Sequence, residues 1–154
     1  MFETEKFELP VRVNEIGRVV VPAIFENLDD LLSVRHGTMD EQDIRRMKIS
    51  EALVDTGASR ISVPIEFIER LGLKRHKEVS LRTANGWRKT GMYELVKVSV
   101  FDRETFSEVI ELPSGSPVLI GQLPLQSMDW VIDMKNECLR GNPEHGGEWM
   151  DEVW

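Results

Sequence analysis

Apolar and polar residues alternate along most of the chain, or apolar residues form short runs, and both patterns are typical of β-strands. Strands are predicted within residues 11–27, 47–55, 78–101, 106–112 and 129–139. Turn residues interrupt two of these stretches, Asn14 to Gly17 in the first and Asn85-Gly86 in the third, and each interruption predicts a β-hairpin. The pattern therefore predicts a mainly β chain.

Helical spacing of apolar residues is confined to short segments. Residues 65–71 show it and are followed by Gly72, which predicts a short helix with a glycine end. Another short helix is expected directly after the apolar run 118–120. With two or three short helices beside its strands, the chain fits a closed or nearly closed β-barrel.

An insertion at about residues 27–46 separates the first two strands, because the alternation of apolar and polar residues is lost there. Thr38 and Glu41 form a capping-box pattern within it. This pattern predicts a helix from about Met39 to Arg46.

Length and composition fit one globular domain, with 154 residues of which 41% are hydrophobic and 30% charged. We expect residues 1–143 to form this domain and residues 144–154 to form an acidic tail that contains tryptophan. No apolar run approaches the roughly 20 residues that span a bilayer. The amino terminus, "MFETEKFELP", carries acids where a signal peptide has basic and apolar regions. A cytoplasmic protein without a membrane partner is therefore expected.

Charge and metal-binding residues narrow the function classes further. The formal net charge of −8 opposes nucleic-acid binding, which depends on Lys and Arg neutralising phosphates. Cys138 is the single cysteine, and His36, His76 and His145 lie far apart in sequence and outside metal-binding motifs. We expect a packed thiol, histidines in surface or loop positions, and neither a metal site nor a cofactor.

The motif D-T-G-A-S at residues 55–59 follows the apolar run Ala52-Leu53-Val54. A turn directly after a strand holds a side chain rigidly, here the carboxylate of Asp55. In isolation the motif also fits an ordinary Asx turn, in which the aspartate hydrogen-bonds the backbone two residues on. Downstream, V-L-I-G at residues 118–121, a short helix and the apolar stretch "DWVIDMKNECL" follow in order, and this combination favours a catalytic interpretation.

This order of motifs resembles the retropepsin-like (clan AA) aspartic proteases of the single-domain prokaryotic type, over about residues 17–143. The resemblance implies a β-barrel of the retropepsin type and hydrolysis of peptide bonds in peptide or protein substrates. Two carboxylates that share one proton can deprotonate a water and protonate the carbonyl oxygen of the substrate. Because the chain has a single D-T-G motif, the resemblance implies a homodimer whose two Asp55 side chains meet on a twofold axis.

The resemblance also implies roles for the residues that follow the catalytic Asp55. The hydroxyl of Thr56 would reach the turn of the partner subunit, and Gly57 would let its N–H approach the carboxylate. Ala58 would leave room for the main chain of the substrate. Ser59 would donate a supporting hydrogen bond to the carboxylate.

Two other segments acquire roles by the same resemblance. Ile120 and Gly121 would pack beneath the D-T-G turn. The hairpin around Asn85, Gly86 and Trp87 would be a flap that closes over a bound peptide. Trp87 would contact substrate side chains or, alternatively, only cover apolar surface.

Alternatives remain open for the whole chain. It could be a catalytically silent module of the same fold that binds peptides or dimerises. Residues 10–36 also resemble the swapped-hairpin DNA-binding domains of bacterial transition-state regulators, although three arginines against four acids there disfavour phosphate binding. Asp133, which also follows an apolar run, is a weaker candidate for the catalytic acid.

The carboxy-terminal tail contains apolar residues four positions apart, the pairs Trp149/Val153 and Met150/Trp154. Tryptophan side chains are costly to leave in water. An acidic tail is expected to be solvated and mobile, and the alternative hypothesis is that this tail docks on its own domain, on a partner subunit, or in the peptide groove as an autoinhibitor.

Overall fold

The computed structural model describes residues 18–153. The strands are β1 (Val19–Asn27), β2 (Arg46–Val54), β3 (Ile61–Pro64), β4 (Arg75–Thr83), β5 (Gly86–Val100), β6 (Arg103–Leu112), β7 (Leu119–Ile120), β8 (Trp130–Asp133) and β9 (Cys138–Gly141). The helices are α1 (Leu28–Arg35), α2 (Ile65–Leu71) and α3 (Gln122–Ser127), with 3-10 turns η2 (Glu41–Asp43) and η3 (Pro143–His145). No helix among the described residues is both long and apolar enough to cross a membrane.

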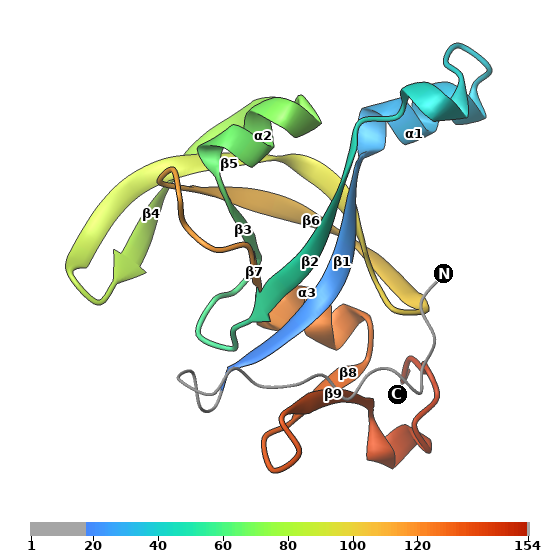
Figure 1. Ribbon diagram of the computed structural model, residues 1–154, viewed down its shortest axis with the longest axis vertical. Helices are drawn as coiled ribbons and strands as arrows, with labels where there is room; N and C mark the ends of the chain where they lie inside the picture. Colours follow the sequence, from blue (N-terminus) through green and yellow to red (C-terminus); the bar gives the residue numbers. More distant parts are fainter. Residues whose placement is uncertain (1–17, 154) are drawn as a thin grey trace.

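Seven strands form one sheet in the order β1-β2-β7-β3-β6-β5-β4 (Figure 1). Because β1 also pairs with β5, six of the strands close a ring, and β4 extends the sheet beyond it. The remaining two strands, β8 and β9, form a separate antiparallel pair. The mainly β fold of the retropepsin type, with three short α-helices, is thus confirmed.

The interior of the ring is built from alternate residues of its strands. In β1 every second side chain, from Val19 to Phe25, is buried, as expected for a strand with one face toward a core. Val96, Val98 and Val100 of β5 are fully buried in the same way. These branched side chains fill the ring and fix the register of its strands, because a one-residue slip would turn them outward.

The helix predicted from about Met39 to Arg46 is wrong, because the helix of this segment is α1, at Leu28–Arg35. Asn27 caps α1, and its side chain accepts a hydrogen bond from the backbone N–H of Asp30 at 3.0 Å. Residues 41–43 form only a single 3-10 turn, since β2 begins at Arg46. The buried carboxylate of Asp30 then binds the guanidinium of Arg45 and joins the two ends of the insertion.

The other predicted elements have mixed outcomes. The helix at residues 65–71 is confirmed, and Gly72 ends it with a φ of 65°. The single strand predicted at residues 129–139 is wrong, because a turn divides it into β8 and β9. Cys138 is buried, as predicted. The hairpin predicted at residues 14–17 lies outside the described residues.

Residues 19–27 do not support the resemblance to swapped-hairpin DNA-binding domains. They form the single strand β1, which pairs with β2 and β5 of the same chain. The segment is therefore part of the ring.

The end of the described chain docks on its own domain. Buried Arg103 donates hydrogen bonds to the carbonyl oxygens of Met128, Asp129 and Gly147, the last two at 2.7 Å. The indole N–H of Trp149 donates to the carbonyl of Ser127 at 3.1 Å. Polar contacts thus hold residues 145–152 on the same chain, whereas the side chains of Trp149, Met150 and Val153 remain exposed.

His145 lies in the turn η3, which fits the expected loop position, but its side chain is not on the open surface. Its side chain is only 10% exposed, and its two ring nitrogens lie 2.6 Å from Asp129 and 2.7 Å from Glu152. His36 and His76 are exposed, as predicted. We use the term C-terminal latch for residues 145–152 together with Arg103 and Asp129, which hold them.

Candidate active site

The turn that carries Asp55 begins where β2 ends. The backbone N–H of Asp55 donates to the carbonyl of Ile120 at 3.0 Å, which continues the parallel pairing of β2 with β7. The N–H of Gly57 donates to Oδ1 of Asp55 at 2.8 Å, and the N–H of Ala58 donates to the Asp55 carbonyl at 3.1 Å. The carboxylate is therefore held by its own turn in the Asx arrangement.

The start of α3 holds the same turn from below. The N–H groups of Gly121, Gln122 and Leu123 donate to three consecutive carbonyls, those of Arg60, Ala58 and Ser59, at 3.0, 2.9 and 3.0 Å. Strand β7 lies between β2 and β3, parallel to the first and antiparallel to the second. An isolated Asx turn needs none of these contacts. We call this set of backbone bonds the α3 clamp.

Close packing of the turn on the clamp requires glycine at position 121, and Gly57 lies tightly against the Asp55 side chain. A Cβ atom on Gly121 would lie 2.5 Å from the carbonyl oxygen of Arg60 and 2.6 Å from that of Ala58, which is too close for any side chain. A Cβ atom on Gly57 would lie 3.0 Å from Oδ1 of Asp55. The structure thus brings Ile120 and Gly121 directly beneath residues 55–59.

One side of the turn remains open. Asp55 is half-buried, while Thr56 and Gly57 are exposed. Among residues 18–153, no hydrogen-bond donor is recorded for Oδ2 of Asp55. An open carboxylate oxygen is available to a water, a substrate or a second carboxylate.

The predicted role of Ser59 differs from its geometry in this chain. Its side chain is exposed, and no hydrogen bond from its hydroxyl to Asp55 is recorded within the described residues. Its backbone carbonyl instead accepts from Leu123 as part of the α3 clamp.

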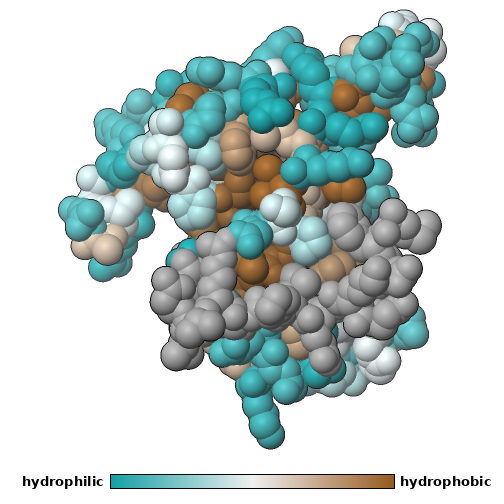
Figure 2. Space-filling model, viewed as in Figure 1, coloured by the Kyte–Doolittle hydropathy of each residue, from teal (hydrophilic) through white to brown (hydrophobic). Residues whose placement is uncertain are grey.

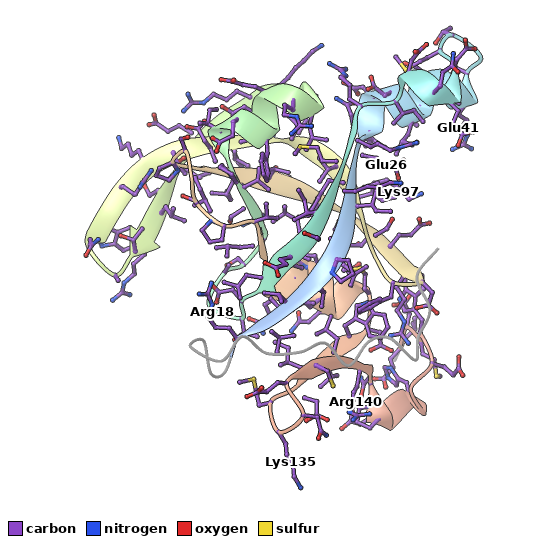
Figure 3. All side chains as sticks on the ribbon, viewed as in Figure 1. Arg18, Glu26, Glu41, Lys97, Lys135 and Arg140 are labelled. Atoms are coloured by element: carbon purple, nitrogen blue, oxygen red, sulfur yellow. The ribbon has the colours of Figure 1, made fainter. Side chains whose placement is uncertain are left out.

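A pocket of about 270 Å³ lies beside Asp55. Besides the end of β2, it is lined by Arg18, Val19, Ile132 and Met134. Arg18 precedes β1 and lies beside the turn (Figure 3). The sequence analysis did not identify Ile132 and Met134 as pocket residues, because no pattern in the sequence relates residues 129–139 to the D-T-G turn.

The largest described pocket, of about 550 Å³, is elsewhere. Residues near α1 and on β4, β5 and β6 line it, and none of them belongs to the D-T-G turn. Size alone therefore does not identify the candidate site, because the D-T-G turn lines the smaller pocket.

Asp133 does not compete with Asp55 for a catalytic role. Its two carboxylate oxygens accept hydrogen bonds from the side chain and backbone of Asn136, and it also binds Arg140. These bonds, those from Asn136 foremost, hold the pKa of Asp133 far below its usual range. It is a structural acid that closes the β8–β9 turn.

The predicted flap residues lie on the β4–β5 hairpin, away from the D-T-G turn. Ala84 and Asn85 form the loop, and Gly86 begins β5 with a φ of 107°. The Thr83 hydroxyl donates to the Gly86 carbonyl at 2.9 Å and fixes the loop. Trp87 is 72% exposed. The hairpin projects from the ring on the side where the turn after β2 also lies (Figure 1).

A comparison with known protein families agrees with the motifs and with the geometry of the candidate site. The family described as "gag-polyprotein putative aspartyl protease" matches residues 43–127, which is more than half of the sequence and includes β2, the D-T-G turn, the hairpin and α3. No curated protein gives a significant match. Members of retropepsin-like families usually act on peptide substrates. The chain belongs to this family of retropepsin-like aspartyl proteases.

Proposed function

We propose that the protein is an aspartic endopeptidase that uses a pair of Asp55 carboxylates, one from each subunit of a homodimer. The observation that carries this proposal is the position of Asp55 in a turn fixed by the α3 clamp, with Oδ2 open. Catalysis requires groups held in place before the substrate arrives. Backbone bonds on both sides of the turn meet that requirement.

The second carboxylate must come from another copy. The chain has one D-T-G motif, and Asp133, the other acid after an apolar run, is occupied by Asn136 and Arg140. The exposed face of Thr56 and Gly57 is accessible to a second subunit. A twofold axis through this face brings equivalent residues together.

The reaction proceeds in two steps. One ionised Asp55 takes a proton from a water, whose oxygen bonds to the scissile carbonyl carbon while the protonated Asp55 of the other subunit gives its proton to the carbonyl oxygen. The tetrahedral intermediate then collapses: the Asp55 that is now ionised takes a hydroxyl proton from it, the C–N bond breaks, and the leaving nitrogen takes the proton of the other Asp55, which leaves the dyad singly protonated again. Two carboxylates at close range cannot both ionise, so the singly protonated pair persists over an acidic to near-neutral range.

The β4–β5 hairpin is the flap in this proposal. Its strands are joined by backbone hydrogen bonds from Lys77 to the tip, so the hairpin can move as one unit about its base. An exposed indole at position 87 presents a large apolar surface to a bound peptide. Closure would exclude water from the dyad.

The test combines oligomeric state with activity. Sedimentation measures the assembly, and an unfolded protein is digested at acidic and near-neutral pH by the wild type and Asp55→Asn. Asn keeps the size and the Gly57 hydrogen bond but cannot ionise. We expect a dimer whose cleavage falls by at least about a thousandfold in the variant, as for other residues that act on the reacting atoms.

Mixing provides the control for a shared site. Wild type mixed with an excess of Asp55→Asn should lose activity as mixed dimers form, because each mixed dimer has one ionisable partner. A stable monomer without activity at every concentration would refute the dyad and favour the silent peptide-binding module. An Asp55→Asn variant that cleaves normally would place catalysis elsewhere.

A further inference from the structure

Charge is distributed very unevenly between the β4–β5 hairpin and the rest of the chain. The chain carries 19 Lys and Arg against 27 Asp and Glu, for a net charge of −8. The stretch from Lys74 to Lys89 holds six of the basic residues and only one acid, Glu78. The hairpin is therefore strongly basic, while the remainder of the molecule is strongly acidic. The space-filling view shows hydrophilic side chains over this projection and apolar ones across the middle of the same face (Figure 2).

The basic side chains near the tip are exposed on both faces of the hairpin. Arg88 lies opposite Leu81 on one face, whereas Lys89 and Trp87 lie on the other, opposite Ser80 and Arg82. The Lys89 side chain is 74% exposed. If the hairpin closes over a peptide, either face of its tip therefore brings positive charge to the bound peptide.

Little of this charge is neutralised within the hairpin. Glu78 lies 3.8 Å from Lys89 and 3.7 Å from Arg75, and its own side chain is 56% exposed. Exposed pairs of this kind are weak. Arg82 lies over the Trp87 ring at 5.9 Å, and among residues 18–153 neither Arg82 nor Arg88 has a recorded ion pair. These cations are available to a ligand.

We propose that the enzyme prefers acidic substrates: peptide segments with Asp or Glu flanking an apolar pair at the scissile bond. The basic side chains of the hairpin bind the flanking carboxylates, and Trp87 covers the apolar pair. This inference rests on the proposed function, because the hairpin meets the substrate only as the flap. A positive flap on a negative protein also steers acidic peptides toward the site and away from the rest of the surface.

A basic hairpin with an exposed aromatic side chain also fits single-stranded nucleic acid. That polymer carries a charge at every nucleotide, so a bound strand would extend beyond the hairpin onto an acidic surface that repels it. A short acidic peptide carries only a few charges, and these can all lie against the hairpin. The charge distribution therefore favours the peptide.

The probes are three pools of fluorogenic decapeptides with the same mixed apolar residues at the two central positions, flanked on both sides by Glu, Gln or Lys. For the wild type at pH 6, where Glu is ionised, we expect kcat/KM for the Glu pool to exceed that for the Gln pool by about tenfold. The Lys pool should be cleaved most slowly. Raising the salt to 0.5 M should shrink these ratios, because exposed charges are then screened.

Paired substitutions assign the preference to the hairpin. Arg88→Gln with Lys89→Gln should reduce the Glu-to-Gln ratio to about twofold, and Arg88→Glu with Lys89→Glu should favour the Lys pool. The matched control removes two exposed positive charges from the helices, Arg35→Gln in α1 and Arg70→Gln in α2, and should leave the ratio unchanged. The reversal in the double-Glu variant is a gain of activity, so it cannot arise from misfolding.

The outcomes separate the two proposals. If the wild type cleaves none of the three pools, nor the unfolded protein, the proposed function fails. If it cleaves Glu and Gln pools equally, or if the helix control lowers the ratio as much as the hairpin pair, the proteolytic function stands and the acidic preference is refuted. A third outcome would assign the hairpin to nucleic acid instead. In it, the wild type cleaves the pools equally and binds an oligo-dT strand in a salt-sensitive way, and Arg88→Gln with Lys89→Gln abolishes this binding.

Discussion

The D-T-G turn and the tip of the β4–β5 hairpin are both short connections between strands, but they are held in different ways. The turn receives backbone hydrogen bonds from its own residues, from β7 and from the start of α3. The tip is fixed by Thr83, the β4–β5 ladder and one stacking contact, and otherwise meets solvent. Bonds to distant segments immobilise the first, and local bonds alone shape the second.

In the proposed function, this difference corresponds to two tasks in catalysis. A carboxylate that moves protons must be placed within a fraction of an ångström before the substrate binds. A flap must open and close, so it is expected to have few tertiary contacts. Changes in the turn should therefore affect stability and turnover together, whereas changes at the tip should affect substrate binding alone.

Apart from Asp55→Asn, the largest effect on activity is expected for Gly121→Ala. The new methyl group would lie 2.5–2.7 Å from backbone atoms of residues 58 and 60, so the α3 clamp must shift. We expect a loss of about 1–3 kcal/mol in unfolding free energy, as for other overpacked sites, and at least about a hundredfold loss of activity. Urea unfolding and kcat measure the two effects. Native activity in this variant would show that the clamp does not position Asp55.

The next effect concerns Arg103→Met, which keeps the apolar stem of a buried side chain but removes the donors to three carbonyls. It also removes the cation that lies 4.0 Å from the Trp130 ring. We expect the unfolding free energy to fall by about 2–4 kcal/mol, because buried carbonyls lose their partners. The matched control on the hairpin, Arg82→Met, should change it by less than about 0.5 kcal/mol. Equal losses of unfolding free energy in Arg103→Met and Arg82→Met would mean that the hairpin and the rest of the domain do not differ in how they are held.

A smaller effect, confined to binding, is expected for Trp87→Ala. Since Trp87 is 72% exposed, its removal should change the unfolding free energy by less than about 0.5 kcal/mol. Truncation of an aromatic contact costs a complex about 1–2 kcal/mol, so KM should rise by about 5- to 30-fold while kcat changes little. Steady-state kinetics on an apolar-centred peptide measure both constants. An unchanged KM would show that Trp87 only covers surface.

The smallest effect concerns the C-terminal latch and depends on pH. Hydrogen bonds to Asp129 and Glu152 raise the pKa of His145 above its ordinary 6.5. The stabilisation from protonated His145 is therefore complete below about pH 6.5 and is lost as the pH rises through the higher folded-state pKa. We expect His145→Gln to destabilise the protein most at pH 5–6 and progressively less toward pH 8.

Asp129 determines the lower limit of the pH range in which the C-terminal latch stabilises the protein. Burial raises its pKa, but hydrogen bonds from His145, Met150 and Asn142 outweigh this effect and hold the pKa below its ordinary 3.8. Its contribution is present above about pH 3.8 and disappears as the pH falls through the lower value. Urea unfolding of wild type and His145→Gln from pH 3 to 8 tests both limits. A difference that does not vary with pH would mean that His145 acts by packing alone.

Sequence patterns predicted the parts of the fold that depend on local chemistry. The approach of β2 to Asp55, the end of α2 at Gly72 and the β4–β5 hairpin each follow from residues within a few positions of one another. The D-T-G motif was recognisable because several short patterns occur in one order along the chain.

The features that could not be predicted depend on contacts between distant residues or on competing local signals. Arg103 reaches carbonyls 25 to 44 positions away, which no periodicity indicates. The turn between β8 and β9 is made by Asn136 binding Asp133 and by a positive φ at Glu137, within a stretch that was expected to form one strand. Thr38 and Glu41 matched a capping box, but Asn27 caps the helix that forms.

The parallel pairing of β2 with β7 has a consequence for the order in which the protein is made. Asp55 leaves the ribosome early, whereas the clamp that orients it comes from residues 121–123, and the ring closes only when residues 96–99 reach β1. Because chains emerge from the amino terminus, the turn remains without this support until residues 121–123 have been synthesised. Under the proposed function, an unfinished copy of the protein therefore cannot hold Asp55 in the geometry that catalysis requires.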